Sequence, residues 1–167
     1  MDKEEFRRVT TEVLREYGFN KKIRNWYFMN MERVVVHVNL CAARFEEGAF
    51  ALMYILCFKD IHEDCEFRTL EDYRKMPFDL GVWKYLYTGE MLEDQNGDQY
   101  KKWAYYPEEY TEERWRELLK AMIHKEFDPL QTDFENYVRE KYPPEKLGMG
   151  IAQKAAFIER GLIFKEK

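Results

Sequence analysis

The chain has too few cysteines for a disulfide scaffold. Cys41, Cys57 and Cys65 are odd in number among 167 residues, and none of them belongs to a CxxC pair. Disulfide-bonded domains and structural zinc sites need more cysteines at matched spacings. We therefore expect reduced thiols and no zinc site built on these residues.

Long apolar runs are also missing. A membrane helix needs about 18 or more consecutive apolar residues, and no stretch approaches that length. The first ten residues, MDKEEFRRVT, contain no apolar segment of the kind found in signal peptides. These absences predict a cytoplasmic protein without a membrane partner.

No cluster of Lys and Arg stands out, and the formal net charge is -5. Because such clusters bind the phosphate backbone, we expect no nucleic-acid partner. The acids themselves are unevenly placed. Residues 60–72 contain Arg68 as the one base among six acids, and a second acidic stretch consists of Glu90, Glu93, Asp94 and Asp98. These stretches predict either attraction to a basic protein partner or solvated loops that aid solubility.

Familiar catalytic and metal-binding motifs are absent as well. The sequence has no Gly-rich phosphate loop, no G-x-S-x-G elbow and no HExxH helix. His62, Asp64 and Cys65 are ligand-type residues in one segment, but zinc needs a second set at matching spacing. The segment 94–98 lacks the glycine and glutamate positions of an EF-hand loop. We therefore expect no metal and no cofactor.

The composition that is present is that of a globular protein. Hydrophobic residues make up 46% of the chain and charged residues 35%, which excludes the disordered class. A length of 167 residues fits one domain, so residues 1–167 are expected to form a single domain.

Hydrophobic spacing in the first third predicts a helix followed by three strands. Asp2 fits an N-cap, apolar residues recur at helical spacing, and Gly18 ends the helix. Segments 22–29, 33–41 and 49–58 have strand character and form a meander. One face of the second strand is aliphatic, and we expect this face to contact the helix. The third strand is apolar on both sides, which predicts that later helices cover the other face of the sheet. The aliphatic residues are Val34, Val36, Val38 and Leu40.

The second half adds a hairpin and helices. Segments 82–93 and 98–105 are predicted strands joined by Asn96-Gly97, a strong hairpin signal. The connection 60–81 is expected to hold a short helix near 70–75, and helices are expected over about 111–127, from Asp128-Pro129 to Pro143, and on to about residue 160. The predicted fold is α+β, with an N-terminal helix on an antiparallel sheet of about five strands, followed by about three C-terminal helices.

The first 70 residues resemble a bacterial family catalogued as domain of unknown function 4304. The resemblance rests on Trp26-Tyr27, on Phe50, on Cys65 with Arg68, and on two longer segments, Tyr17-Gly18-Phe19-Asn20-Lys21-Lys22 and Val38-Asn39-Leu40 with Ala43-Arg44-Phe45. It departs from the family at Cys41-Ala42-Ala43, where polar residues are usual. The resemblance implies an α+β fold and a bacterial or phage source, and it implies no reaction.

Several polar residues in unusual settings are candidates for a binding site. His37 and Asn39 share one face of a strand, where the histidine is either a base oriented by the amide or a hydrogen-bonded residue at the edge of the core. Arg44 and Arg68 carry guanidinium groups that bind carboxylates or phosphates, or else anchor loops. The full candidate set is His37, Asn39, Arg44, Arg68, Trp26 and Asp64.

Two hypotheses of function follow. The first is a binding module that resembles an immunity protein or an inhibitor and uses acidic loops and aromatic strands to contact a basic protein. The alternative is a small-ligand-binding protein or enzyme with a polar cleft around Arg44, Arg68 and His37. A homo-oligomer joined through an exposed strand edge is a third possibility.

Overall fold

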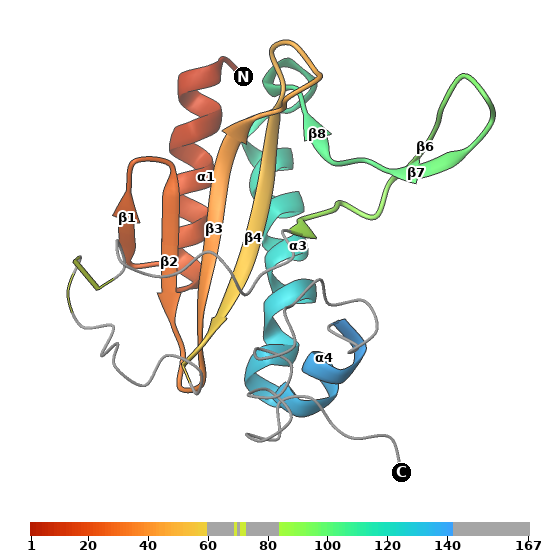
Figure 1. Ribbon diagram of the computed structural model, residues 1–167. Coiled ribbons are helices and arrows are strands. Elements are labelled where there is room, and N and C mark those ends of the chain that lie inside the picture. Colours follow the sequence, from red (N-terminus) through yellow and green to blue (C-terminus); the bar gives the residue numbers. More distant parts are fainter. Residues whose placement is uncertain (60–68, 70, 73–83, 142–167) are drawn as a thin grey trace.

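Figure 1 shows the computed structural model of the chain, which describes residues 1–59, 69, 71–72 and 84–141. Helix α1 spans Lys3–Tyr17 and is the helix that the sequence predicts. The carboxylate of Asp2 accepts hydrogen bonds from the backbone N–H groups of Glu5 and Glu4, both at 2.8 Å, and these bonds lower the pKa of that carboxyl. The helix ends at Gly18, whose φ of 128° favours glycine.

The main sheet is antiparallel, and its order is β1-β2-β3-β4-β5, with β8 also paired to β4. The long central strands β3 and β4 pair throughout their length, from Val34 opposite Phe58 to Ala42 opposite Phe50. The predicted fold, an N-terminal helix on an antiparallel sheet of about five strands, is confirmed. The strands are β1 (Lys21–Ile23), β2 (Trp26–Asn30), β3 (Val34–Ala42), β4 (Phe50–Phe58), β5 (Lys84–Tyr85) and β8 (Ala104–Tyr105).

The segment predicted as one strand over 22–29 is two strands, β1 and β2. Arg24 has a φ of 55°, a left-handed conformation that turns the chain back on itself. Ile23 then pairs with Trp26 across this turn. Aromatic content alone does not reveal such a turn, because arginine carries no turn preference of its own.

The described C-terminal half holds the 3-10 helix η2 (Pro107–Glu109), helix α3 (Glu112–Thr132) and helix α4 (Phe134–Lys141). The predicted break at Asp128-Pro129 is wrong, since α3 continues through Pro129 to Thr132. Proline lacks the N–H that would bond the carbonyl four residues earlier, but the buried side chains of Phe127 and Leu130 keep this turn packed on the core. The helix expected toward residue 160 and most of the one near 70–75 lie outside the described residues.

Both long helices pack on the same face of the sheet (Figure 1). The aliphatic face of β3 meets α1, as predicted, and α3 lies beside α1 on that face rather than on the opposite one. Trp115 of α3 is fully buried, and its indole Nε1 donates a hydrogen bond of 2.9 Å to Thr10 of α1. None of the described helices covers the second face of the sheet, so the expectation that later helices cover it is wrong for α3 and α4. The apolar side of α3 packs instead against α1 and the first face of the sheet.

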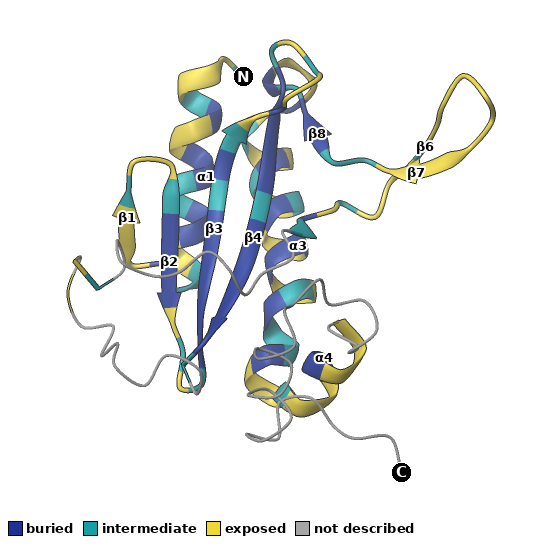
Figure 2. Ribbon diagram, viewed as in Figure 1, coloured by how far each residue is buried: buried dark blue, intermediate teal, exposed yellow. Residues whose placement is uncertain are grey.

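Figure 2 shows how burial divides the molecule. Strands β3 and β4 are buried along most of their length, whereas the hairpin of β6 (Met91–Glu93) and β7 (Gln99–Lys101) has no buried residue. This hairpin is a separate two-stranded sheet, and in Figure 1 it projects away from the body of the molecule. We call residues 90–101 the arm.

Candidate functional site

The arm is folded by a short turn that the sequence predicts correctly. Gly97 has a φ of 83°, the left-handed conformation of the last residue in a three-residue hairpin loop, whereas Asn96 does not have the positive φ of a two-residue Asn-Gly turn. The carboxylate of Asp94 accepts hydrogen bonds from the backbone N–H groups of Asp98 and Asn96, at 2.9 and 2.8 Å. These bonds lower the pKa of the Asp94 carboxyl, so the tip is held by an ionised group at neutral pH. The expected long strands 82–93 and 98–105 are shorter here: β6 and β7 form the arm, and β5 and β8 join the main sheet.

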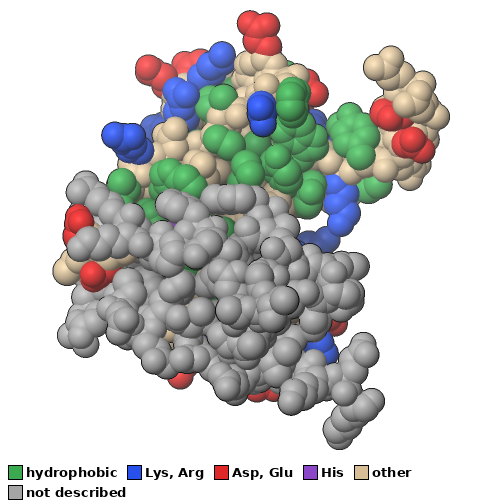
Figure 3. Space-filling view, in the orientation of Figure 1, with side chains coloured by type: hydrophobic (Ala, Val, Ile, Leu, Met, Phe, Trp, Pro, Cys, Tyr) green, Lys and Arg blue, Asp and Glu red, His purple; other side chains and the backbone are tan. Residues whose placement is uncertain are grey.

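The arm exposes hydrophobic and acidic side chains together. Met91 is 49% exposed and Tyr100 is 41% exposed. The second acidic stretch, Glu90, Glu93, Asp94 and Asp98, lies on this arm, with Lys101 as its one base. In Figure 3 the arm stands out from the body with acidic side chains on its surface, and hydrophobic side chains gather beside it.

The base of the arm is tied to the body. The backbone N–H of Lys102 donates to the carbonyl of Glu90 at 2.9 Å, which closes the two ends of the arm. The Lys102 ammonium lies 2.8 Å from a carboxylate oxygen of Glu109 and 3.5 Å from one of Glu90. These contacts fix the direction in which the arm leaves the sheet.

An aromatic groove adjoins the arm. Its volume is about 540 Å³, and it connects the turn after β3 with β5 and β7. Phe45 is 80% exposed, and the guanidinium of Arg44 lies 5.4 Å from the centre of its ring. A cation over an exposed ring in this way is stabilised only weakly, by about 0.5–1 kcal/mol. The lining residues are Arg44, Phe45, Tyr85, Tyr87, Tyr100, Lys101 and Trp103.

Three of the candidate residues named from the sequence lie together on the second face of the sheet. Trp26 pairs with Asn39 across β2 and β3, and the ring of His37 lies edge-on to Trp26, with the centres 6.4 Å apart. His37 is 1% exposed, and burial lowers its pKa to about 3. The histidine is therefore neutral at physiological pH and is enclosed by rings.

Arg44 lies elsewhere, beyond the end of β3 and on the aromatic groove. His37 is five residues from the end of β3, so a rise of about 3.3 Å per residue separates the two positions by roughly 17 Å or more. Arg68 and Asp64, together with most of the acidic stretch 60–72, lie outside the described residues. The polar cleft around Arg44, Arg68 and His37 thus stays a prediction.

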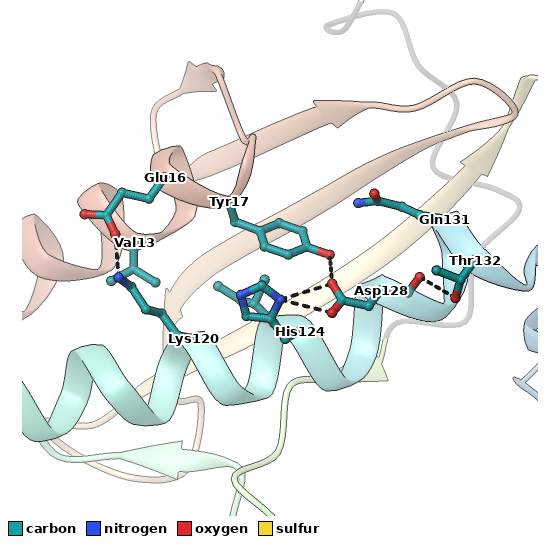
Figure 4. A pocket seen from close by; sticks show the side chains of 9 residues that line it. Val13, Glu16, Tyr17, Lys120, His124, Asp128, Gln131 and Thr132 are labelled. Atoms are coloured by element: carbon teal, nitrogen blue, oxygen red, sulfur yellow. Dashed lines mark hydrogen bonds and ion pairs between the residues drawn. The ribbon is translucent and has the colours of Figure 1, made fainter.

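A second polar cluster, which the sequence reasoning missed, lies between α1 and α3 (Figure 4). The Tyr17 hydroxyl donates to the carboxylate of Asp128 at 2.8 Å, and Nδ1 of His124 lies 3.1 Å from the same carboxylate. These groups line a cavity of about 650 Å³. His124 and Asp128 are four residues apart on a helix, but the predicted helix ended near Phe127, which concealed the pair.

This cluster fits a tie between helices better than a reaction centre. An oriented Asp–His pair is part of a general base, but the described residues that line this cavity include no serine or cysteine. The hydroxyl of Thr132 donates to the backbone carbonyl of Asp128 at 3.1 Å. Hydrogen bonds from Tyr17, and then from His124, lower the pKa of Asp128, so the carboxylate stays ionised and links the two helices.

The described residues contain no group of three or more His, Cys, Asp or Glu side chains that could hold a metal ion. Within the same part of the chain no helix is both long enough and apolar enough to span a bilayer. In comparisons with known proteins, no family model, no curated protein and no solved structure matches the chain. The resemblance to domain of unknown function 4304 therefore stays a prediction.

Proposed function

We propose that the chain is a protein-binding module that contacts a basic protein through its arm and the adjoining aromatic groove. The observation that carries this proposal is a hairpin with exposed Met91 and Tyr100 that adds no buried residue to the core. Folding alone does not explain why such a hairpin presents large apolar side chains to solvent. A binding role explains both their exposure and the direction of the arm.

The chemistry of the surface indicates the class of partner. Tyrosine, tryptophan and methionine are enriched at the centres of protein interfaces. Tyr100 and Trp103 line the groove, whereas Met91 pairs with Lys101 and is exposed on the face of the hairpin opposite Tyr100. The arm also carries the acids Glu90, Glu93, Asp94 and Asp98, which favour a partner with Lys and Arg at matching positions. A module that covers a basic site on another protein would act as an immunity protein or an inhibitor does.

The arm is also organised before binding. Its turn is held by the Asp94 carboxylate and its base by the backbone bond between Lys102 and Glu90. A preformed hairpin loses less conformational entropy when it docks than a flexible loop would. The polar cleft remains the second hypothesis, and no contact among the described residues specifically favours it.

The test is an affinity purification from the native host, quantified by mass spectrometry, with two matched variants. The arm variant carries Glu93→Lys and Asp98→Lys and leaves Asp94, which holds the turn, in place. The control carries Glu117→Lys and Glu140→Lys, which change the net charge equally at exposed helix positions outside the arm.

We expect the wild-type chain to enrich a basic protein, and the arm variant to lose about tenfold or more of that enrichment, because like charges placed opposite each other are strongly unfavourable. The control should retain it. Equal retention by the arm variant, or equal loss by the control, would rule out the arm as the contact.

A further inference from the structure

Four lysines line one cavity on the side of the molecule where β5, α3 and the end of α4 meet. The cavity has a volume of about 460 Å³, within the range of small-molecule sites. Lys84 lies on β5, Lys101 ends β7, Lys125 is on α3 and Lys141 ends α4. In a chain with a net charge of -5, this gathering of cations is unusual.

Among the described residues that line the cavity, the one carboxylate is already neutralised by its neighbours. Glu126 lies 3.1 Å from the ammonium of Lys141, and it accepts hydrogen bonds from the Tyr137 hydroxyl, at 2.9 Å, and from the Tyr54 hydroxyl. By contrast, neither Lys101 nor Lys125 forms an ion pair within the described part of the chain. Their charges remain available to an anion.

Aromatic rings border the same cavity. Tyr85 and Tyr87 line it, and their ring centres are 6.1 Å apart. The Tyr85 side chain itself packs on the second face of the sheet, on the other side of β5 from Lys84. The ammonium of Lys101 lies 5.4 Å from the centre of the Tyr87 ring, so a cation and a ring lie side by side at this cavity. Trp103, whose ring centre is 5.3 Å from that of Tyr85, extends this aromatic wall into the neighbouring groove.

Lysine ammonium groups bind phosphate as compact charges, and tyrosine and tryptophan rings stack on nucleobases whatever their sequence. We propose that this cavity binds a nucleoside phosphate, with Lys101 and Lys125 around the phosphate and the ring of Tyr87 against the base. The ammonium of Lys84 already donates to the backbone carbonyl of Lys141 at 2.8 Å. The site is independent of the proposed protein-binding function, although it shares Tyr85, Tyr87 and Lys101 with the groove. A phosphate next to a nucleobase occurs both in a free nucleotide and in single-stranded nucleic acid.

Isothermal titration calorimetry on the full chain tests the proposal with ADP, adenosine, orthophosphate and a ten-residue oligothymidylate. We expect ADP to bind more tightly than either adenosine or orthophosphate, since only ADP engages both the Tyr87 ring and the lysines. Lys125→Gln should weaken ADP binding about tenfold or more, the usual loss for a hydrogen bond between charged groups. Lys125 is exposed and forms no ion pair among the described residues, so this variant should fold.

The matched control is Lys120→Gln on the same helix. The ammonium of Lys120 lies 2.8 Å from a carboxylate oxygen of Glu16, and Lys120 does not line the cavity. It should bind ADP as the wild type does. Tighter binding of the oligothymidylate, with the same dependence on Lys125, would assign the site to a single strand and support the shared chemistry. Absence of ADP and oligothymidylate binding at millimolar concentration, or equal weakening by both substitutions, would overturn the proposal. Since Lys125 is not part of the arm, this outcome is separate from the fate of the protein-binding function.

Discussion

A single buried histidine makes the stability of this protein depend on pH. His37 is 1% exposed on the second face of the sheet, and burial lowers its pKa from 6.5 to about 3. The unfolded chain therefore binds a proton between these values that the folded chain does not. Stability is fully present above pH 6.5 and is lost as the pH falls toward about 3.

We predict that replacing His37 with Phe flattens this dependence. Each proton taken up only by the unfolded state costs about 1.4 kcal/mol per pH unit, so between pH 6.5 and 5 the wild type should lose about 2 kcal/mol more than His37→Phe. Urea unfolding across this range measures the difference. Val35→Ala, which removes buried volume at a neighbouring position of the same face, should keep the wild-type slope; equal slopes for all three proteins would contradict the argument.

The sequence predicts which residues share the face of His37 but not how deeply that face is buried. The two-residue spacing of His37 and Asn39 predicts that they share a face of a strand, and the register with β2 places Trp26 opposite Asn39. The spacing does not say how deeply that face is buried. Burial depends on segments far away in the sequence, and this is why the same histidine permitted opposite interpretations.

At the scale of elements, charged side chains connect α1 to α3 along the exposed side of their contact. Arg116 of α3 lies 2.6 Å from a carboxylate oxygen of Glu12, 3.1 Å from one of Glu16 and 3.1 Å from one of Glu112. Arg8 of α1 lies 2.6 Å from Glu112 in the opposite direction. The hydrogen bonds of Arg116, and then of Arg8, lower the pKa of Glu12 below its ordinary 4.5.

We predict that Arg116→Gln lowers the thermal midpoint by about 2–4 °C at pH 7 and low salt, the scale of one exposed ion-pair network. Because the folded pKa of Glu12 is lowered, the contribution of the network exists above pH 4.5 and disappears as the pH falls further. The difference between variant and wild type should therefore shrink at pH 3.5 and in high salt. Arg114→Gln is the control, since the 3.8 Å contact of Arg114 with Glu117 lies within α3. If the midpoint difference between Arg116→Gln and the wild type is the same at pH 7 and at pH 3.5, the stabilisation by Arg116 is not electrostatic.

Elements were predictable where the decisive signal was local. Helix α1 begins after Asp2 and ends at Gly18, and Asn96 and Gly97 lie in the turn of the arm. Both features were predictable because caps and turns depend on a few adjacent residues. The end of α3 was predicted wrongly, since the packing of Phe127 and Leu130 outweighs the missing hydrogen bond of Pro129. Which face α3 covers depends on tertiary contacts with α1, and no window of sequence contains both helices.

At the scale of the whole molecule, the candidate sites join residues that are far apart in the chain. The groove brings Phe45 beside Tyr100, and the lysine cavity brings Lys84 beside Lys141. A sequence scan for basic clusters finds nothing here because the four lysines are spread over residues 84–141. The acids and the turn of the arm were visible beforehand; their position next to an aromatic groove was not.

The whole molecule should fold without its arm. The backbone bond of 2.9 Å between Lys102 N–H and the Glu90 carbonyl shows that the two ends are already adjacent, so Asn-Gly can replace residues 91–101 as a tight turn. No residue of the excised segment is buried, and a shorter loop loses less entropy on closure.

We therefore predict that the thermal midpoint of the shortened chain stays within about 2 °C of the wild type. As a comparison, Leu119→Ala removes a fully buried side chain of α3 and should lower the free energy of unfolding by about 2–5 kcal/mol. Differential scanning calorimetry compares the three proteins. The shortened chain should at the same time fail to enrich the basic partner. A fall in its midpoint as large as that of Leu119→Ala would mean that the arm stabilises the fold, and the exposure of Met91 and Tyr100 would then no longer argue for binding.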